Sequence, residues 1–323
     1  ADLPSWRPPS YNEADVLDKP DWLHAIPLLT AEESNALDAF RIAQTRTLLA
    51  VDDAVAEIMT ALVRAGRLAN TFIVFTSDNG FLWGEHRLKG KRAPYDEAIR
   101  VPFVVRYDPL VARARSDPRL VLNVDIAPTV AALAGAAAPG AEGRSIEPLL
   151  HGADVLWRTG FLVENRGRPR TYCALRRADD SFVTYATGER ELYDAAGDAY
   201  QLTNLAGDPA RSSTAAALRR RLARLCNPPP PGLSRELLCT REGTPSADVL
   251  RGTARYDVLC GRRGKDHLYP RGGEDWVYAG RRNDLVDSRD GHADVIRCGP
   301  GKDVVRADRR DRLRADCERI LLP

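Results

Sequence analysis

The spacing of apolar residues in the first third of the chain predicts a long helix. Thr30 and Glu33 form a capping box, in which each side chain can bind a free amide of the first helical turn. Gly66 is a residue that commonly ends a helix. Between them, apolar residues recur at helical spacing, and they are Leu37, Phe40, Leu48, Leu49, Val51, Val55, Ile58 and Leu62.

Two short apolar runs beyond this helix predict buried strands. Residues 71–76 (TFIVFT) and 101–106 (VPFVVR) are rich in β-branched and aromatic side chains. The polar, glycine-containing stretch between them is long for a loop, and such loops are usually functional. Residues 120–137 predict the end of a strand followed by a helix, and Asp125 lies near the start of that helix. This order of elements is typical of an α/β fold.

The pattern changes near Thr171. Residues 171–194 predict two or three short antiparallel strands, with turns at 178–181 and 187–189. An amphipathic helix is expected over 213–225, with Leu218, Leu222 and Leu225 on its apolar side. Four prolines in residues 226–232 (CNPPPPG) then exclude a helix or a central strand, which indicates a linker.

The last part of the chain is a repeat. Aspartates recur every nine residues, with one extra residue before Asp294, and an aliphatic residue lies two positions after each of them. This period is typical of a parallel β-roll, with aliphatic side chains inside and aspartates in the turns. The aspartates are Asp248, Asp257, Asp266, Asp275, Asp284, Asp294 and Asp303, and the aliphatics are Leu250, Leu259, Leu268, Val277, Val286, Ile296 and Val305.

We therefore expect an α/β chain of four parts. Residues 1–150 would hold part of a mixed sheet flanked by helices, and residues 151–226 a small antiparallel sheet with a helix. Residues 227–240 would be a proline-rich linker, and residues 241–323 the β-roll.

Charged residues make up 28% of the sequence, and the formal net charge is only +2. We therefore expect no nucleic-acid partner, and no apolar run reaches the about 18 residues of a membrane span.

Six cysteines are present, at spacings that match no zinc site. Their even number favours disulfides in an exported protein, and six reduced thiols are the alternative. Proximity suggests two pairs, Cys226 with Cys239 and Cys298 with Cys317. Residues 1–9 do not look like a signal peptide, and the start looks like the middle of a gene.

Residues 75–106 contain the most specific candidate chemistry. Asp78 and Asn79 follow the first predicted strand, and both carry hard oxygen donors suited to calcium or magnesium. By itself this Asp-Asn-Gly would more simply be a turn. His86, Lys89 and Lys91 alone would likewise be ordinary solvated charges.

Taken together, this segment resembles the carboxyl-terminal signature of the type I sulfatases, in the alkaline phosphatase superfamily. It carries TSDNG, GEH, GK, PYDE and IRVPFVVR in that order. The resemblance is strongest to the branch with glucosamine-6-sulfatases and bacterial polysaccharide sulfatases, and it covers residues 1–225. Further similar segments are SYNEADVLDKPDWL, LLAVDDAVAEI, VDIAPTVAALAG, GRSIEPLLHG and ERELYDAAGDAYQLTNLAGDP.

The resemblance implies roles for four residues. Asp78 and Asn79 would be calcium ligands, and Lys91 would contact the sulfate. His86 would lie near the site and take part in catalysis. The C/S-x-P-x-R motif that yields the formylglycine nucleophile of sulfatases does not occur in this sequence. We therefore expect the chain alone to be inactive, as the carboxyl-terminal part of a sulfuric ester hydrolase.

The tail resembles the hemolysin-type (RTX) calcium-binding repeats of secreted bacterial proteins. The resemblance implies calcium at Asp257, Asp266, Asp275 and Asp284. Glycines are patchy, so Arg–Asp pairs or the Cys260 and Cys298 thiols are the alternative to calcium in individual turns.

Three functions are thus open. The first is a secreted or cell-surface bacterial sulfatase with a sulfated sugar or polysaccharide and calcium as partners. The second is a phosphatase or phosphodiesterase of the same superfamily, but those zinc enzymes usually have Asp-His where this chain has Asp78–Asn79. The third is a non-catalytic calcium-binding or cell-surface module with a relic sulfatase domain.

Overall fold

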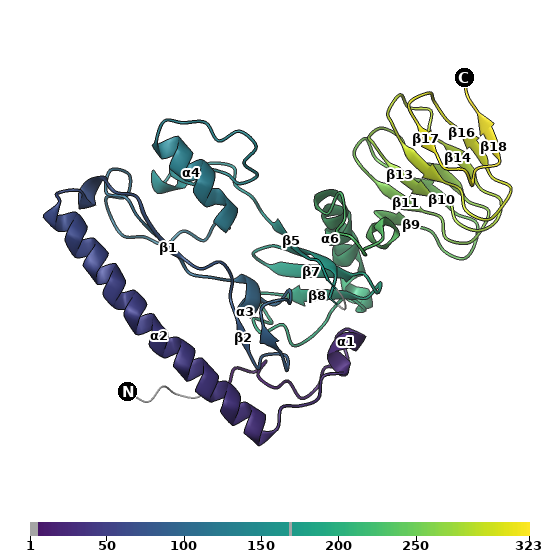
Figure 1. Ribbon diagram of the computed structural model, residues 1–323. Coiled ribbons are helices and arrows are strands. Elements are labelled where there is room, and N and C mark those ends of the chain that lie inside the picture. The colour runs from purple at the N-terminus through teal and green to yellow at the C-terminus, as the bar shows by residue number, and fades with distance from the viewer. Residues whose placement is uncertain (1–5, 168–169) are drawn as a thin grey trace. The chain divides into compact units, whose positions relative to one another are not determined.

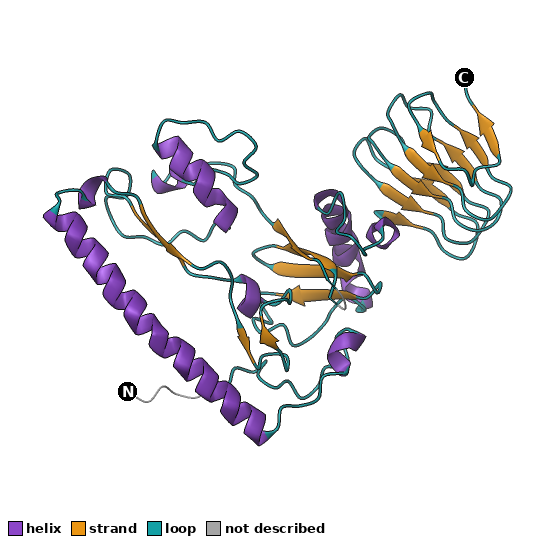
Figure 2. Ribbon diagram, viewed as in Figure 1, coloured by secondary structure: helices purple, strands orange, loops and turns teal. Residues whose placement is uncertain are grey.

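The chain divides into two compact units, which are described separately. The computed structural model describes residues 6–167 and 170–323. The first unit holds the residues up to Gly160, with 177–179 and 195–203. The second unit holds Phe161–Arg176, Asp180–Asp194 and Asn204–Pro323. Figure 1 labels the elements of both units, and Figure 2 colours them by type.

The long helix of the first unit is α2, Ala31–Arg64, and it confirms the predicted capping box. The Glu33 amide donates to Thr30 Oγ1 at 3.2 Å, and the Thr30 amide donates to Glu33 Oε2 at 2.8 Å. Only Leu37 of its predicted apolar positions is buried, whereas Leu48 and Ile58 are each 58% exposed. No described helix is both long and apolar enough to cross a membrane.

The two predicted strands of this unit pair with each other. β1, Ile73–Thr76, runs antiparallel to β4, Phe103–Arg106, with Ile73 opposite Arg106. The segment between them contains a small hairpin, formed by β2 and β3, and a one-turn helix. These elements are β2 (Leu82–Trp83), β3 (Lys89–Gly90) and α3 (Asp96–Ile99).

Asp125 organises the remainder of the first unit. Its carboxylate accepts the amides of Leu122 and Arg144 at 2.8 Å each and pairs with the Arg158 guanidinium. Because it is fully buried and bound on every side, Asp125 fixes the start of the predicted helix. The other elements are α1 (Asp21–His24), η1 (Leu68–Asn70), η2 (Asn123–Asp125), α4 (Ile126–Leu133) and α5 (Glu147–Leu150).

The second unit begins with a four-stranded antiparallel sheet in the order β5-β6-β7-β8. Helix α6, Ser212–Leu225, contributes Leu218 and Leu222 to its core, while the predicted apolar Leu225 is 40% exposed. A short helix, η3 (Pro209–Arg211), precedes α6. The strands are β5 (Phe161–Asn165), β6 (Tyr172–Arg176), β7 (Asp180–Tyr185) and β8 (Arg190–Asp194).

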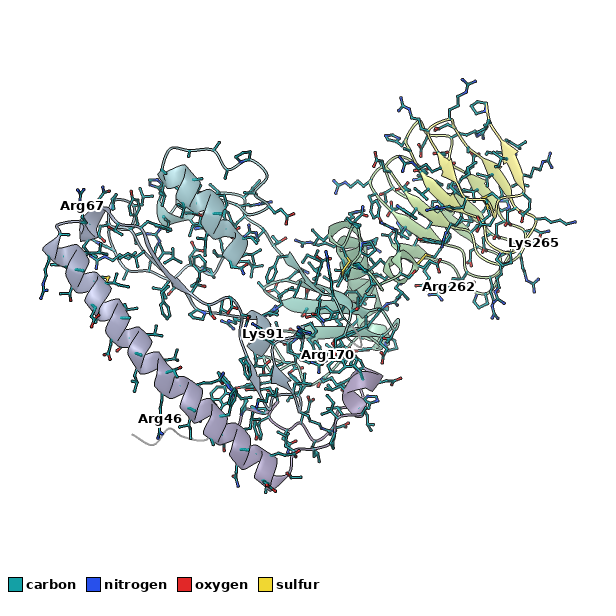
Figure 3. The ribbon with its side chains drawn as sticks, viewed as in Figure 1. Arg46, Arg67, Lys91, Arg170, Arg262 and Lys265 are labelled. Carbon is teal, nitrogen blue, oxygen red and sulfur yellow. A yellow bond between two sulfur atoms is a disulfide. The ribbon has the colours of Figure 1, made fainter. Side chains whose placement is uncertain are left out.

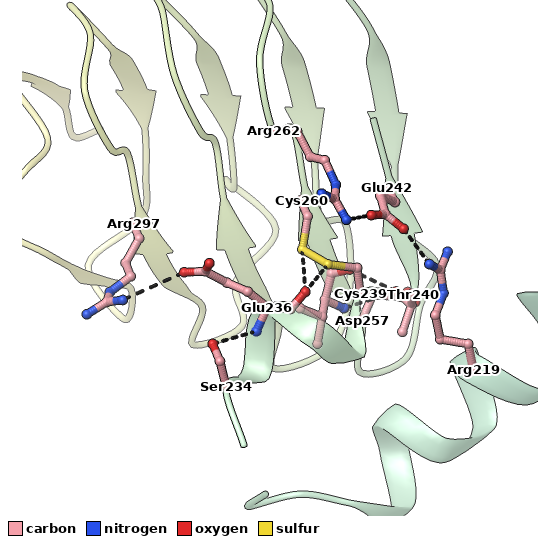
Figure 4. The surroundings of a disulfide bond; sticks show 11 residues. Arg219, Ser234, Glu236, Cys239, Thr240, Glu242, Asp257, Cys260, Arg262 and Arg297 are labelled. Carbon is pink, nitrogen blue, oxygen red and sulfur yellow. Dashed lines mark hydrogen bonds and ion pairs between the residues drawn. A yellow bond between two sulfur atoms is a disulfide. The ribbon is translucent and has the colours of Figure 1, made fainter. Parts of the chain in front are cut away.

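The proline-rich segment packs within the second unit instead of separating two units. Leu233 and Leu238 are buried against the same core as α6, the latter from the short helix η4, Arg235–Leu238. Glu242 binds both Arg219 of α6 and Arg262 of the next coil, as Figure 4 shows. The antiparallel sheet, this segment and the repeat therefore form one continuous packed body.

The repeat forms the predicted parallel β-roll. Two sheets of five parallel strands have the orders β10-β12-β14-β16-β18 and β17-β15-β13-β11-β9. Two nine-residue repeats make one coil, so Val249 lies opposite His267. The predicted aliphatic residues from Leu259 to Val305 are fully buried between the sheets. The strands are β9 (Arg241–Glu242), β10 (Val249–Arg251), β11 (Val258–Cys260), β12 (His267–Tyr269), β13 (Trp276–Tyr278), β14 (Leu285–Asp287), β15 (Val295–Arg297), β16 (Val304–Arg306), β17 (Arg312–Leu313) and β18 (Arg319–Leu321).

All six cysteines are paired. The predicted bridge between Cys298 and Cys317 is confirmed. The predicted Cys226–Cys239 bridge is wrong, because Cys226 pairs with Cys173 of β6 and Cys239 pairs with Cys260 of β11. Figure 4 shows the latter pair. Proximity in sequence failed here because α6 folds back on the sheet and brings Cys226 to a strand 53 residues earlier.

Candidate active site and cation sites

The turn after β1 presents two oxygen-bearing side chains. Asp78 and Asn79 follow the strand directly, and the Asp78 side chain is 81% exposed. Asp78 Oδ1 accepts the Asn79 amide at 3.0 Å, which orients the carboxylate within the turn. The turn therefore offers a carboxylate and an amide oxygen to solvent, both of them hard donors.

Lys91 approaches these same side chains. Its Nζ donates to Asn79 Oδ1 at 2.6 Å and lies 3.6 Å from Asp78 Oδ2. The β2–β3 hairpin brings them together, because Leu82 pairs with Gly90 and the segments on either side of the hairpin emerge next to each other. Figure 3 labels Lys91 within the first unit. Three of the four predicted active-site residues thus form one exposed, charged group.

Gly80 holds this turn against α3. Its amide donates to the Ala98 carbonyl at 2.9 Å, and a Cβ at this position would lie 2.0 Å from the Glu97 carbonyl oxygen. No other residue fits without moving the backbone. Packing therefore explains the glycine of the Asp-Asn-Gly motif, and Gly80 by itself carries no information about metal binding.

The structure buries His86, the fourth residue expected to take part in the site. The side chain is fully buried, with Nδ1 2.7 Å from Glu13 Oε2 and the ring stacked on Tyr95 at 3.9 Å between centroids. Its Nε2 lies 3.9 Å from Glu97 Oε2. These contacts place His86 in the packing of the loop, and its expected part in catalysis stays a prediction.

Sequence reasoning missed the partners of His86. Glu13 lies 73 residues before it, and Lys19 Nζ lies 3.5 Å from the Glu13 carboxylate while donating to the Gln201 carbonyl at 2.7 Å. No local pattern marks Glu13 or Lys19 as members of a buried network. Such a network specifies how the loop packs.

The aspartates of the repeat form two columns along the β-roll. In each column, the amide of one aspartate donates to Oδ1 of the aspartate one coil later. The bond from Asp266 to Asp284 measures 2.8 Å, and that from Asp275 to Asp294 measures 2.9 Å. One column contains Asp248, Asp266, Asp284 and Asp303, and the other contains Asp257, Asp275 and Asp294.

The turns of the β-roll differ in whether the Oδ2 atom of their aspartate has a hydrogen-bond partner. In five turns Oδ2 is buried and has no hydrogen-bond partner. A buried anionic oxygen without a partner is costly, so these positions need a proton or a cation. The five residues are Asp266, Asp275, Asp284, Asp294 and Asp303.

Burial changes the acidity of these carboxyls. It raises the pKa of Asp275 to about 9, that of Asp294 to about 8 and that of Asp284 to about 7. The backbone amide on Oδ1 opposes this rise of the pKa, and neighbouring carboxylates add to it. Burial in the columns thus disfavours the charged form of these carboxyls.

In the first two turns, threonines donate hydrogen bonds to the Oδ2 atom of the aspartate, and we call these closed turns. The Thr253 amide and hydroxyl donate to Asp257 Oδ2 at 2.7 and 2.6 Å, and Thr240 Oγ1 donates to Asp257 Oδ1 at 2.8 Å. Thr244 binds Asp248 Oδ2 in the same way. Both oxygens of Asp257, a predicted calcium ligand, are therefore occupied. A threonine four residues before the aspartate is the sequence signal that marks these closed turns.

Two family profiles match overlapping parts of the chain. The profile described as Sulfatase matches residues 11–136, and the profile described as N-sulphoglucosamine sulphohydrolase, C-terminal, matches residues 84–227. Both the Asp78–Lys91 group and the antiparallel sheet fall within these matches. Residues 11–227 belong to the sulfatase family. The predicted family is thereby confirmed for this part of the chain.

Known sulfatases are similar to this part. An arylsulfatase of Volvox carteri is 32% identical over 254 residues, which cover 66% of this chain and 38% of the relative. The N-acetylglucosamine-6-sulfatase of Homo sapiens is 39% identical over 137 residues, which cover 41% of this chain and 24% of the relative. The chain thus spans well under half the length of these relatives.

Solved structures confirm the predicted sulfatase-type fold. One was determined in complex with its substrate D-glucosamine-2-N,6-O-disulfate; it is 24% identical with a TM-score of 0.52, over 68% of this chain and 52% of the other. The phosphonate monoester hydrolase of Agrobacterium radiobacter is 26% identical with a TM-score of 0.55, over 60% of this chain and 42% of the other.

Proposed function

We propose that this chain supplies part of the active site of a sulfuric ester hydrolase acting on a sulfated sugar. The observation that carries the proposal is the Lys91 ammonium, which faces the oxygens of Asp78 and Asn79 within 3.6 Å. Membership in the sulfatase family supports the reaction class. The similarity to N-acetylglucosamine-6-sulfatase supports an amino sugar sulfated at O6 as the substrate class.

In this proposal Asp78 and Asn79 each contribute one oxygen to a calcium ion. Their donor types fit, since calcium takes six to eight oxygen ligands, so the others come from elsewhere in the protein. Bound there, calcium would stabilise negative charge on the sulfate oxygens. Lys91 carries the remaining role. Its side chain is 53% exposed, so it can turn from the Asn79 oxygen towards an anionic sulfate.

The nucleophile is not among the residues of this sequence. A formylglycine motif C/S-x-P-x-R does not occur in it. We therefore propose that the chain hydrolyses sulfate esters only together with a segment that carries this motif. Asp78, Asn79 and Lys91 would bind and orient the sulfate against that nucleophile.

The test is Asp78→Ala in a full-length enzyme that joins this sequence to such a segment. Hydrolysis of glucosamine 6-sulfate should fall at least about 100-fold, the usual loss for a group that stabilises transition-state charge. Asp108→Ala is the matched control, because Asp108 is an exposed carboxylate paired with Arg106 outside the turn. An unchanged rate in Asp78→Ala would remove Asp78 from the site.

The same assay separates two chemistries. Similarity to a phosphonate monoester hydrolase favours a second candidate, hydrolysis of phosphonate or phosphate esters. Both esters present an anionic tetrahedral centre to Lys91, so substrate preference decides between them. A higher kcat/KM for a phosphonate monoester than for the sulfate ester would replace the sulfatase proposal.

We also propose that the β-roll binds calcium and that the protein works outside the cytoplasm or at the cell surface. Three disulfides support export, because such bonds persist in oxidising surroundings. The buried Oδ2 atoms without partners support cations at Asp266, Asp275 and Asp284, whereas Asp257 is left out. A non-catalytic calcium-binding module would share these features but would show no esterase activity in the assay above.

A further inference from the structure

The β-roll contains one coil that breaks the nine-residue period. Ten residues separate Asp284 from Asp294, where nine separate the other neighbouring aspartates. The longer turn places an additional carboxylate, Asp290, beside the column. Gly291 follows with φ +85°, and the His292 amide donates to Asp290 Oδ1 at 2.8 Å, so the turn holds Asp290 in place.

Three carboxylates meet at this coil. One oxygen each from Asp275, Asp290 and Asp294 lies within 4.8 Å of the other two. The Oδ2 atom of each residue is buried and has no hydrogen-bond partner. Asp275 and Asp294 are fully buried, whereas the Asp290 side chain is 16% exposed. We call these residues the carboxylate triad.

Among the residues that the structure describes, no ion pair to Asp275 or Asp294 is found. The charges that act most strongly on Asp275 and Asp294 are other carboxylates, Asp257 and Asp290 among them. The exposed His292 is the partner of Asp290, and its Nδ1 lies 3.3 Å from Asp290 Oδ1. Like charges this close repel strongly once they are removed from water.

The spacing of the triad fits one calcium ion. Calcium binds oxygens at about 2.3–2.6 Å, so two ligands of one ion lie at most about 5 Å apart. The three triad oxygens lie within 4.8 Å of one another, which is less than this maximum. The regular turns that the structure describes hold no comparable group of three metal-ligating side chains.

We propose that Asp275, Asp290 and Asp294 bind one calcium ion at the ten-residue coil, more tightly than any regular turn of the β-roll binds one. Three anionic oxygens on one ion give a stronger attraction than one. The partly exposed Asp290 side chain leaves a path for the ion and for water ligands to enter. This site rests on the proposed calcium binding of the β-roll and does not depend on the sulfatase reaction.

The test is a calorimetric titration of Ca²⁺ into the chelator-treated full chain. Asp290→Asn should weaken the tightest binding event at least about 10-fold, because it removes one of the three charges. The asparagine Oδ1 can still accept the His292 amide, so the turn keeps its hydrogen bond. Asp287→Asn is the matched control, since Asp287 is paired with Arg289 instead of the triad.

Asp284→Asn distinguishes the triad from the regular turns. It removes a carboxylate of the other column and should leave the tightest event unchanged. An Asp290→Asn chain that titrates like the unmodified chain, or an unmodified chain that binds no Ca²⁺, would overturn the triad. If Asp284→Asn abolishes the tightest binding event and Asp290→Asn does not, the β-roll still binds calcium, but the triad is not the site. Circular dichroism in chelator checks folding, and Asp290→Ser replaces Asp290→Asn if that variant does not fold.

Discussion

The turn after β1 and the columns of the β-roll use the same oxygen chemistry in opposite environments. Asp78 is 81% exposed and has Lys91 beside it, whereas Asp275 and Asp294 are fully buried with carboxylates as their charged neighbours. In the turn, solvent screens the charges and leaves the groups free to bind a substrate. In the columns, desolvation dominates and the groups require a counter-charge. Position in the fold therefore decides what an aspartate can do.

The two regions also differ in how apolar residues are covered. Ile296 and Val286 are fully buried between the sheets of the β-roll, whereas Leu48 of α2 is 58% exposed. The β-roll repeats one packing arrangement, so each aliphatic residue contacts its equivalents one coil away. The stripe on α2 has no such cover among the described residues. Helical periodicity thus predicted the helix, and the structure leaves most of its apolar positions exposed or half-buried.

The largest expected effect is on catalysis through the exposed turn. In an enzyme that joins this sequence to a segment with a formylglycine motif, Lys91→Ala should lower kcat/KM for the sulfate ester about 10²- to 10³-fold, because the ammonium proposed to stabilise the sulfate oxygens is lost. Arg92→Ala, the exposed neighbour, should change the rate little. A loss below about 10-fold for Lys91→Ala would show that this ammonium does not contact the reacting group.

The next effect contrasts the two apolar regions. Ile296→Ala should destabilise the β-roll by about 2–5 kcal/mol, because a buried side chain is replaced by a cavity. Leu48→Ala on the exposed stripe of α2 should cost less than about 0.5 kcal/mol. Hydrogen exchange resolved by segment measures both. Equal destabilisation by the two variants would mean that the α2 stripe is covered in solution.

Calcium should stabilise one region and leave the other nearly unchanged. A ligand at 100 times its Kd stabilises a fold by about 2.7 kcal/mol. Calcium added to the chelator-treated chain should therefore slow hydrogen exchange in residues 241–323. Residues 31–106 contain only Asp78 and Asn79 as proposed ligands and should exchange as before. If calcium slowed hydrogen exchange equally in both regions, calcium binding would not be specific to the β-roll.

The smallest expected effect concerns a closed turn. Thr253→Val removes one of the donors on Asp257 Oδ2 and should destabilise the β-roll by about 0.5–1.5 kcal/mol. Thr60→Val is the matched control, because the Thr60 hydroxyl donates to the Ala56 carbonyl on the exposed surface of α2. Thermal melting compares the two. A neutral Thr253→Val would show that the hydroxyl is not what satisfies Asp257.

Local and periodic signals were sufficient for much of the fold and for part of the site. The capping box at Thr30 involves groups only three residues apart, and the period of nine fixes which side chains point into the β-roll. The Asp78–Asn79 turn with Lys91 was also predictable, since a short hairpin joins them. Each of these features depends on residues near one another in sequence.

Tertiary structure alone decided the rest. His86 is buried by Glu13 and Tyr95, Cys226 pairs with Cys173, and Asp290 reaches Asp275 and Asp294 only because successive coils stack. None of these outcomes follows from the residue types, since each depends on which distant segment excludes water from the group. The sequence by itself determined which groups could carry charge or bind an ion. Burial, which sets the energy of those charges, came from contacts between segments far apart in the chain.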